Sequence, residues 1–408
     1  MRVLYVSHYF PPEIGAPAVR VSQLSKHWRR AGVDVRVLTG FPCHPEGVVP
    51  PEYQAPLRRL VMTEEYEGVP VNRTWIYPAA NRGRWRRSAN YLSFGISAAI
   101  RGSLLDFRPD IVIGTSPQPL CAAAAARIAD RYDAKFIFEV RDLWPESLAA
   151  VGVDSKNSPF YQLLDGVAGW LYDRADRVVI VAESFREELV ARGVDDNKIQ
   201  LVPNGVDLAP FAGDHSVPPD VSQLSDKFVV SYIGTHGLAH ALDTLLEAAN
   251  LLREEPAVHF LFVGGGAARE PLEREAARRG LRNVTFLGPR PWETSPAYLA
   301  ASDACVVHLA RKPLFERVLP SKIFEIMAAG KPILLGVRGE AKRLVDGAQA
   351  GLSFEPESAQ GLASAVLELH RDRDLGNRLG AGGRKWVGAN ATYKSRADNY
   401  LEILEGCC

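Results

Sequence analysis

Strand-length apolar runs alternate with amphipathic segments along the whole chain. In the first half, strands are predicted at 2–7, 34–39, 110–114, 135–140, 177–181 and 199–202. A polar stretch at 213–226 follows, and a second series of strands is predicted at 228–233, 259–263, 284–287 and 304–309. Helical patterns fill most of the intervals, at 19–30, 242–253 and 270–279 among others. Strands that alternate with helices predict parallel sheets covered by helices.

The turn-rich sequence PNGVD at 203–207 separates the two series of strands. With 408 residues, the chain is too long for one ordinary hydrophobic core. Two doubly wound α/β domains of similar size are therefore expected, facing a central cleft. Clefts between domains are preferred ligand sites, and open α/β sheets bind ligands at the carboxyl ends of their strands.

The segment 319–335, LPSKIFEIMAAGKPILL, predicts a loop, a two-turn helix and a buried strand. Ser321 is placed to cap the helix, and Gly330 is placed to end it in a left-handed conformation. Lys322 and Glu325 lie three residues apart and share a face of this helix. A cation at a helix N-terminus suits phosphate, and a carboxylate one turn later suits ribose hydroxyls, so a nucleotide site is indicated. A surface helix with an ion pair is the competing interpretation.

Three glycine-containing loops of the second half follow strands, at 234–241, 264–266 and 288–292. In a parallel sheet they converge with Lys322 and Glu325. Glycines at strand ends let the backbone approach phosphates closely. None of the loops has the G-x-G-x-x-G or P-loop pattern, so each by itself is better explained as a tight turn.

Polar residues of the first half also follow strands. His8, Glu13 and Gly15 lie after the first strand, and His44 lies after the second. The sequence RDLWPES at 141–147 follows the strand at 135–140. Its carboxylate, Arg and Trp suit a network of sugar hydroxyls with ring stacking. The alternative is the start of a capped helix, and the two interpretations are compatible.

Composition narrows the classes of protein. Lys plus Arg and Asp plus Glu both total 48, which argues against a dedicated nucleic-acid binder. The five cysteines have no metal-ligand spacing, so free thiols in a reducing cytoplasm are expected, without a metal site. No signal peptide and no membrane-spanning apolar run are recognised.

The segment 68–105 contains no acidic residue. Arg82, Arg84, Arg86 and Arg87 cluster there around Trp85, ahead of a predicted apolar helix at 91–105. Basic residues with an aromatic residue beside an apolar helix are typical of an interfacial membrane segment. A peripheral association with an anionic membrane on its cytoplasmic face is one interpretation of this segment. A solvated basic face is the alternative.

Three motifs carry a resemblance to a known family. PNGVD, the glycine loop after 228–233 and LPSKIFEIMAAGKPIL resemble the retaining family 4 glycosyltransferases of the GT-B fold. EVRDLWPES resembles the subgroup that builds O-antigen, capsule and related surface glycans. The resemblance implies an acceptor-binding domain over 1–205, a nucleotide-sugar-binding domain over 206–388 and a C-terminal helix over 389–408 that returns to the first domain. Both domains are Rossmann-like, with doubly wound parallel sheets.

The resemblance also assigns roles to residues. Asp142, Lys322 and Glu325 become the catalytic candidates. The implied donor-binding residues are Gly234, Thr235, His236, His240, Gly264, Gly265, Arg290, Pro320, Ser321, Lys322 and Glu325. The implied acceptor-binding residues are His8, Glu13, Gly15, His44, Arg141, Asp142 and Trp144. No metal or other cofactor is implied, because the nucleotide-sugar is a co-substrate.

The chain departs from the family pattern at two places. The family usually has two glutamates with seven residues between them, and the first of these positions falls on Arg317, next to Glu316. The family's Arg and Lys of the first glycine loop fall on Thr235 and His240. Compensation of the diphosphate charge then rests on Lys322, with Arg290, Arg311 or Lys312 as helpers. His240 is a candidate for a change of charge near neutral pH.

The function implied is transfer of a hexosyl or N-acetylhexosaminyl group from a nucleoside-diphosphate sugar, UDP-sugar favoured. The acceptor is a hydroxyl of a glycan, a lipid-linked saccharide or a small molecule, and the anomeric configuration is retained. The alternatives are a sugar-nucleotide epimerase of the same fold and a non-catalytic nucleotide-sugar-binding component of a glycan assembly complex.

Overall fold

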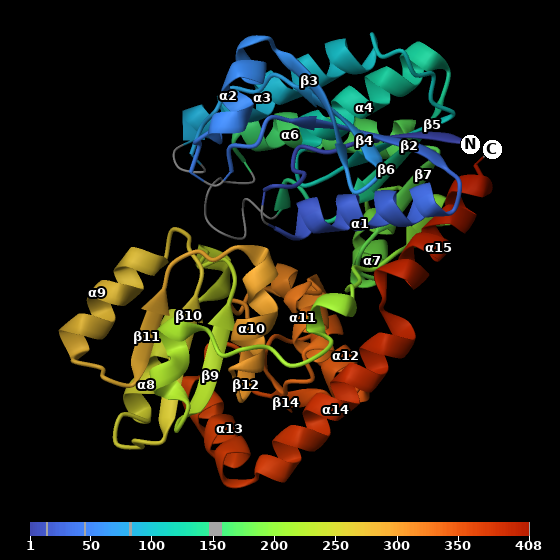
Figure 1. Ribbon diagram of the computed structural model, residues 1–408. Coiled ribbons are helices and arrows are strands. Elements are labelled where there is room, and N and C mark those ends of the chain that lie inside the picture. Colours follow the sequence, from blue (N-terminus) through green and yellow to red (C-terminus); the bar gives the residue numbers. More distant parts are fainter. Residues whose placement is uncertain (14, 45, 81–83, 147–156, 408) are drawn as a thin grey trace. The chain divides into compact units, whose positions relative to one another are not determined.

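The computed structural model describes residues 1–408 except 14, 45, 81–83, 147–156 and 408 (Figure 1). Contacts divide the chain into two compact units. Unit 1 consists of Met1–Asn204 and Tyr393–Cys408, and unit 2 consists of Gly205–Thr392. Each unit has one sheet and its own hydrophobic core.

Unit 1 contains an eight-stranded sheet in the order β3-β4-β2-β1-β5-β6-β7-β8. The neighbouring strands pair in parallel, except for the antiparallel pair β3–β4. The strands are β1 (Arg2–Val6), β2 (Asp34–Gly40), β3 (Val61–Tyr66), β4 (Val69–Thr74), β5 (Ile111–Thr115), β6 (Lys135–Val140), β7 (Arg177–Ile180) and β8 (Ile199–Leu201). The helices are α1 (Ala16–Arg30), α2 (Pro51–Arg58), α3 (Arg84–Gly102), α4 (Pro119–Tyr132), α6 (Pro159–Arg174), α7 (Ser184–Ala191) and α15 (Tyr393–Glu405).

Apolar side chains of β1, β2 and β5 pack against α1 and α15 in the core of unit 1. Trp28 of α1 stacks on Tyr5 at 5.8 Å between ring centroids and meets Tyr400 of α15 edge-on at 5.2 Å. Its indole Nε1 donates a hydrogen bond to the carbonyl oxygen of Ala397 at 3.0 Å. The last helix of the chain is thus part of the core of unit 1.

A buried ion pair lies at the centre of unit 1. The guanidinium of Arg20 on α1 contacts Glu139 of β6 at 2.9 Å, and neither side chain is exposed to solvent. Arg20 also donates to the carbonyl oxygens of Val202 and Pro203 at 2.9 and 3.0 Å. These two carbonyls come just before the end of the first segment at Asn204, so the hydrogen bonds from Arg20 hold that end of the segment against α1.

Unit 2 contains a six-stranded parallel sheet in the order β11-β10-β9-β12-β13-β14. The strands are β9 (Phe228–Ile233), β10 (Val258–Val263), β11 (Val284–Leu287), β12 (Ala304–His308), β13 (Ile333–Gly336) and β14 (Gly351–Ser353). The helices are α8 (Asp243–Leu251), α9 (Arg269–Arg279), α10 (Ser295–Ala300), α11 (Lys322–Ala328), α12 (Glu340–Gly347), α13 (Ala359–Arg371) and α14 (Arg373–Asn390). The main core is formed by the sheet with α8 and α13.

Several sequence-based predictions of elements need correction. The hairpin β3–β4 was not predicted, and α14 was not predicted as a separate helix. The predicted helix at 91–105 is α3 and begins earlier, at Arg84. Ser321 precedes α11 but makes no side-chain capping hydrogen bond, whereas Gly330 has the predicted left-handed conformation, with φ 66°.

None of the described helices combines the length and the apolar character that crossing a bilayer requires.

Candidate active site

The carboxyl edge of the sheet in unit 2 brings the glycine loops together. Because the strands are parallel, the loops that follow β9 and β10 and the segment that leads from β12 into α11 lie at this edge. Gly264 has φ 139°, and a Cβ at this residue would lie 2.0 Å from the carbonyl oxygen of Gly234. A side chain cannot be accommodated there. The two loops therefore pack backbone against backbone, as close approach at strand ends requires.

Lys322 reaches this edge from the first residue of α11. Its ammonium Nζ lies 3.9 Å from the centroid of the Tyr232 ring, and a Cβ built on Gly234 would lie 3.1 Å from it. The Nζ atom is buried and has no hydrogen-bond partner among the described residues. Burial lowers the pKa of Lys322 to about 7, and the Glu325 carboxylate opposes this shift. An unpartnered buried cation beside glycine backbone is suited to a phosphate.

Glu325 lies one turn after Lys322. Its Oε1 accepts a hydrogen bond from the indole Nε1 of Trp292 at 3.5 Å. Burial raises the pKa of Glu325, while the hydrogen bond from Trp292 and the charge of Lys322 act in the opposite direction. The Nζ of Lys322 has no hydrogen-bond partner among the described residues, so the Glu325 carboxylate is not bonded to it.

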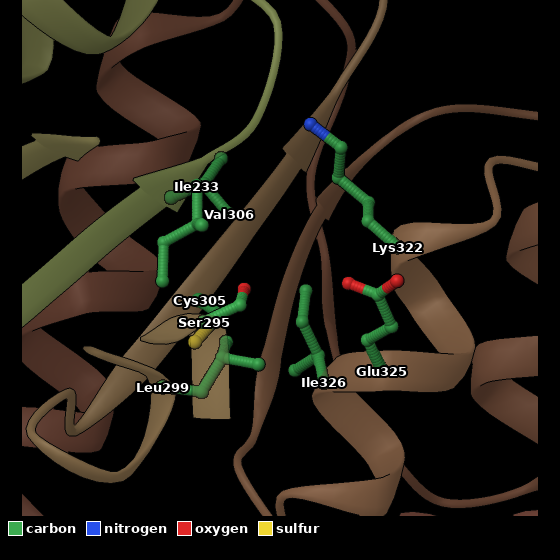
Figure 2. A pocket seen from close by; sticks show the side chains of 8 residues that line it. All are labelled: Ile233, Ser295, Leu299, Cys305, Val306, Lys322, Glu325 and Ile326. Carbon is green, nitrogen blue, oxygen red and sulfur yellow. The ribbon is translucent and has the colours of Figure 1, made fainter. Parts of the chain in front are cut away.

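The two side chains line a pocket of about 250 Å³. Figure 2 shows Lys322 and Glu325 projecting from α11 on one side, with Ile233, Val306 and Leu299 on the opposite side. Ser295, Cys305 and Ile326 complete the lining. A mostly apolar pocket with a few polar groups is typical of small-molecule sites.

His236 and His240 in the first glycine loop are both neutral at neutral pH. Burial, reinforced by the charge of Lys322, lowers the pKa of His236 to about 4 and that of His240 to about 3. The expectation that His240 changes charge near neutral pH is therefore wrong. Both ring nitrogens of His236 lack a hydrogen-bond partner among the described residues, and so does the Nδ1 of His240.

The other predicted donor-binding residues have separate roles. Thr235 is exposed, and its carbonyl oxygen accepts a hydrogen bond from the Tyr232 hydroxyl. The backbone of Gly265 accepts a hydrogen bond from the amide of His236 at 2.8 Å. Pro320 and Ser321 accept the amide hydrogen bonds of Ile323 and Phe324 in the turn that opens α11.

Arg290, a predicted phosphate helper, contacts other side chains of unit 2 in the structure. Its guanidinium contacts the carboxylate of Asp220 at 2.7 Å and the hydroxyl of Tyr298 at 3.0 Å. Glu316, next to the position of the missing family glutamate, faces Arg338 at 3.6 Å and is 45% exposed. These residues do not line the pocket of Lys322 and Glu325.

In unit 1, three of the predicted acceptor-binding residues come together. His8, Glu13 and His44 line a pocket of about 270 Å³, with Tyr9, Cys43, Ala79, Ala80, Arg87, Asn90 and Tyr91. The carboxylate of Glu13 accepts hydrogen bonds from the amides of Cys43 and His44 at 3.0 and 2.9 Å. Gly15 precedes α1 with φ 150° and does not line the pocket. Arg87, one of the four arginines of the predicted membrane cluster, lies in the pocket lining.

Arg141, Asp142 and Trp144 follow β6 and do not line that pocket. The amides of Arg141 and Asp142 donate to the Ser116 hydroxyl at 2.7 and 3.3 Å. Burial raises the pKa of Asp142 to about 6, and the Arg141 charge opposes the shift. The buried Nε and Nη1 of Arg141 have no partner within the described part of the chain. Ser147, the last residue of the RDLWPES segment, lies outside the described residues.

Sequence reasoning missed Trp292, Ser116 and Glu139 as site or supporting residues. For Glu139, a signal was available, because it is a carboxylate inside the apolar strand KFIFEV. Trp292 ends the predicted glycine loop at 288–292 but was not singled out as a side chain, and Ser116 lies in a loop without a recognisable pattern. Their contacts depend on strands that are adjacent only in the folded sheet.

Comparisons with known proteins agree with this arrangement. Residues 15–205 match the model of the glycosyl transferase 4-like domain, and residues 219–386 match the model of glycosyl transferases group 1. Together, the two models account for most of both units.

One similar protein is WcaI of Escherichia coli K12, named as a colanic acid biosynthesis glycosyl transferase. The two are 25% identical over 381 residues, covering 90% of this chain and 92% of WcaI. The sucrose-phosphate synthase structure from Thermosynechococcus elongatus superposes with a TM-score of 0.76 at 20% identity, covering 99% of this chain and 98% of that one. The Anabaena HepE structure with UDP and glucose gives a TM-score of 0.71 at 19% identity, covering 99% of both chains.

The structural likenesses establish the GT-B fold, and the two matched domain models establish the family. Polysaccharide biosynthesis is the setting named for WcaI. This chain therefore belongs to the family 4-like glycosyltransferases with a GT-B fold, in their polysaccharide-biosynthesis group.

Proposed function

We propose that the chain is a retaining glycosyltransferase that takes its sugar from a nucleoside-diphosphate sugar, a UDP-sugar first. The sugar transferred is a hexosyl or N-acetylhexosaminyl group, and the acceptor is a hydroxyl of a glycan, lipid-linked or small-molecule substrate. The observation that carries the proposal is the buried Nζ of Lys322, which has no hydrogen-bond partner among the described residues and lies beside the glycine backbone at Gly234.

In this proposal, the diphosphate lies between Lys322 and the glycine loops, and the ribose hydroxyls donate to Glu325. Two buried neutral imidazoles, His236 and His240, offer further hydrogen bonds without adding charge. The HepE complexes with UDP and with UDP-glucose support a uridine nucleotide as the first choice, since that protein shares the fold.

The proposed chemistry needs no side-chain nucleophile. The leaving phosphate takes the proton of the acceptor hydroxyl on the face where the new bond forms, so the configuration is retained. The protein contributes orientation and stabilisation of the developing negative charge, the second through Lys322. Asp142 is the candidate for orienting the acceptor. We propose that no metal cofactor takes part. Within the described residues, no three His, Cys, Asp or Glu side chains form a metal-binding group.

Replacing Glu325 tests the ribose assignment. Glu325→Ala should weaken nucleotide binding by about 1.5–3 kcal/mol, the range for a hydrogen bond to a charged group. Titration calorimetry with a nucleoside diphosphate measures the change. Glu293→Ala is the matched control, because Glu293 is exposed in the same loop as Trp292. Unchanged affinity in Glu325→Ala would remove the ribose from this carboxylate.

The two alternatives are less favoured, because the matched models and WcaI are named for glycosyl transfer. A sugar-nucleotide epimerase would convert the donor into its epimer, which product analysis detects. A non-catalytic binder would leave the donor intact, without even slow hydrolysis.

We further propose a peripheral location at an anionic membrane surface. Exposed apolar residues recur at helical spacing along one face of α3, with Leu92, Ile96 and Ile100 between 51 and 58% exposed. Trp85 is 89% exposed, and Arg86 beside it is also exposed. Two other arginines of the predicted cluster add little here: Arg82 lies outside the described residues, and only the backbone of Arg84 is described. An apolar stripe flanked by basic residues is suited to the interface of a bilayer.

Flotation with vesicles tests the membrane proposal. Binding should require anionic lipid and decrease with salt, since each basic residue near such a surface contributes roughly 1 kcal/mol. Changing Leu92, Ile96 and Ile100 together to Gln should release the protein. Leu251→Gln in unit 2, also an exposed leucine on a helix, should not. Binding that is independent of lipid charge and of the triple change would contradict the proposal.

A further inference from the structure

The lining of the pocket of unit 1 comes from several separate parts of the chain. His8 and Tyr9 follow β1, Cys43 and His44 follow β2, Ala79 and Ala80 follow β4, and Arg87, Asn90 and Tyr91 belong to the first turns of α3. The space of about 270 Å³ in this pocket includes the open solvent at its mouth. A ligand group can therefore approach the lining from the solvent side.

Most titratable side chains of this pocket are neutral at pH 7, whereas Arg87 is positively charged. Burial lowers the pKa of His8 to about 3 and also lowers that of His44, so both imidazoles are neutral at pH 7. Burial raises the pKa of the Cys43 thiol to about 11, which keeps it protonated. Arg87 has no ion pair or hydrogen bond with any residue that the structure describes. It supplies the permanent positive charge of the pocket lining.

Glu13 is the one acidic side chain of the lining, and it is already engaged. Its Oε1 accepts both amide hydrogen bonds, from Cys43 and His44. Burial raises the pKa of Glu13 to about 7, against the hydrogen bonds and the charge of Arg73. Its negative charge is thus incomplete at neutral pH and bonded to the backbone, so it does not neutralise Arg87.

Two buried imidazole nitrogens also lack partners. The Nδ1 atoms of His8 and His44 are inaccessible to solvent and form no hydrogen bond within the described chain. His8 is only 6% exposed as a residue. A buried polar atom without a partner is costly, and a ligand oxygen that accepts from an N–H would remove that cost. When the hydrogen is on Nδ1, the rings of His8 and His44 can each donate a hydrogen bond to a ligand oxygen. The guanidinium of Arg87 is also a hydrogen-bond donor.

We propose that the pocket of unit 1 binds an acidic oxygen group of the acceptor, a phosphate or a carboxylate, with Arg87 as its charged partner and His8 and His44 as neutral donors. The inference rests on the proposed function, because it gives the acceptor of that reaction a chemical class. The acceptor is a phosphorylated saccharide, free or lipid-linked, or a saccharide that contains a uronic acid. A neutral sugar would leave Arg87 without a partner.

Binding to protein already saturated with UDP tests this class. Because UDP already fills the donor site, an acidic sugar that binds in this experiment binds at a different site. Glucose 6-phosphate, glucuronate and glucose are then titrated by calorimetry. The acidic sugars should bind at least tenfold more tightly than glucose. The stronger of the two acidic sugars identifies phosphate or carboxylate as the natural group.

Variants of two adjacent arginines localise the effect. Arg87→Gln should lose at least tenfold in affinity for the acidic sugar, and Arg87→Lys should recover part of it. Arg86→Gln is the matched control, since Arg86 is exposed and does not line the pocket. UDP affinity should be unchanged in all three variants, so that loss of UDP binding would indicate failure of the donor assignment instead. Equal binding of acidic and neutral sugars, no binding of either, or equal losses in the two Gln variants would overturn the proposal.

Discussion

Glu139→Ala should destabilise unit 1 by about 3–5 kcal/mol, the cost of leaving one partner of a buried ion pair alone. Glu139 and Arg20 are both fully buried, with Nη2–Oε2 2.9 Å apart. The other carboxylate oxygen accepts hydrogen bonds from the hydroxyls of Tyr5 and Thr115, each at 2.8 Å. Truncation would leave an uncompensated guanidinium and two unpaired hydroxyls in the core.

Urea unfolding followed by circular dichroism measures this loss as a lower midpoint. Glu139→Gln should be intermediate, because it keeps the shape and part of the hydrogen bonding. Glu275→Ala provides the comparison, since its ion pairs with Arg278 and Arg279 lie on the surface of α9. Surface pairs contribute little. A Glu139→Ala midpoint equal to that of Glu275→Ala would show that the buried pair does not hold unit 1 together.

Lys322→Ala should weaken the binding of a nucleoside diphosphate roughly 10- to 150-fold, which corresponds to about 1.5–3 kcal/mol for a charge-assisted hydrogen bond. Affinity for the nucleoside should change little, because only the diphosphate carries the charge that Lys322 compensates. Calorimetry with UDP and uridine measures both. Lys342→Ala is the control, since Lys342 pairs with Asp346 on the surface of α12. Equal losses for UDP and uridine would indicate a damaged helix instead.

The same lysine predicts a pH dependence. Burial lowers the pKa of Lys322 to about 7 in the free protein, so its charge is present below pH 7 and is lost as the pH rises. A bound diphosphate raises this pKa, and binding above pH 7 must therefore take up a proton. UDP affinity should decrease from pH 7 to pH 9, with proton uptake in wild type and none in Lys322→Ala. Lys322→Arg should remove the dependence, because arginine stays charged.

Much of each sheet follows from local sequence. Buried parallel strands are short apolar runs, and β9, β6 and β11 have the predicted bounds. Gly330 ends α11 as its sequence position indicates. Lys322 and Glu325 share a pocket because residues three apart lie on one helix face.

The missed elements depend on tertiary packing. The turn of the β3–β4 hairpin places Glu67 at φ 50° and Gly68 at φ 84°, without the Asn-Gly or Asp-Gly pair that usually marks such a turn. Helix α14 contains five glycines, which local propensity counts against a helix. At Gly380, however, a Cβ would lie 2.0 Å from the carbonyl oxygen of Gly330. Glycine is required there because α14 packs directly on the end of α11.

The sequence indicated which segments form the candidate donor site, but it did not indicate which side chains contact one another there. Arg290 was expected to help with phosphate because the family's Arg and Lys are replaced by Thr235 and His240. In the structure its guanidinium pairs with Asp220, 70 residues away in sequence. Trp292 contacts Glu325 across 33 residues. Such contacts depend on which loops become neighbours at the edge of the folded sheet. A single sequence does not show which loops these are.

Amide hydrogen exchange with and without a saturating nucleoside diphosphate tests the donor assignment most directly. Ligand binding slows exchange where it stabilises the folded state. The largest protection is expected in the segments 234–241 and 264–266 and in the first turn of α11 at Lys322. Protection confined to unit 1, or binding without protection of these three segments, would contradict a donor site formed by Lys322 and Glu325.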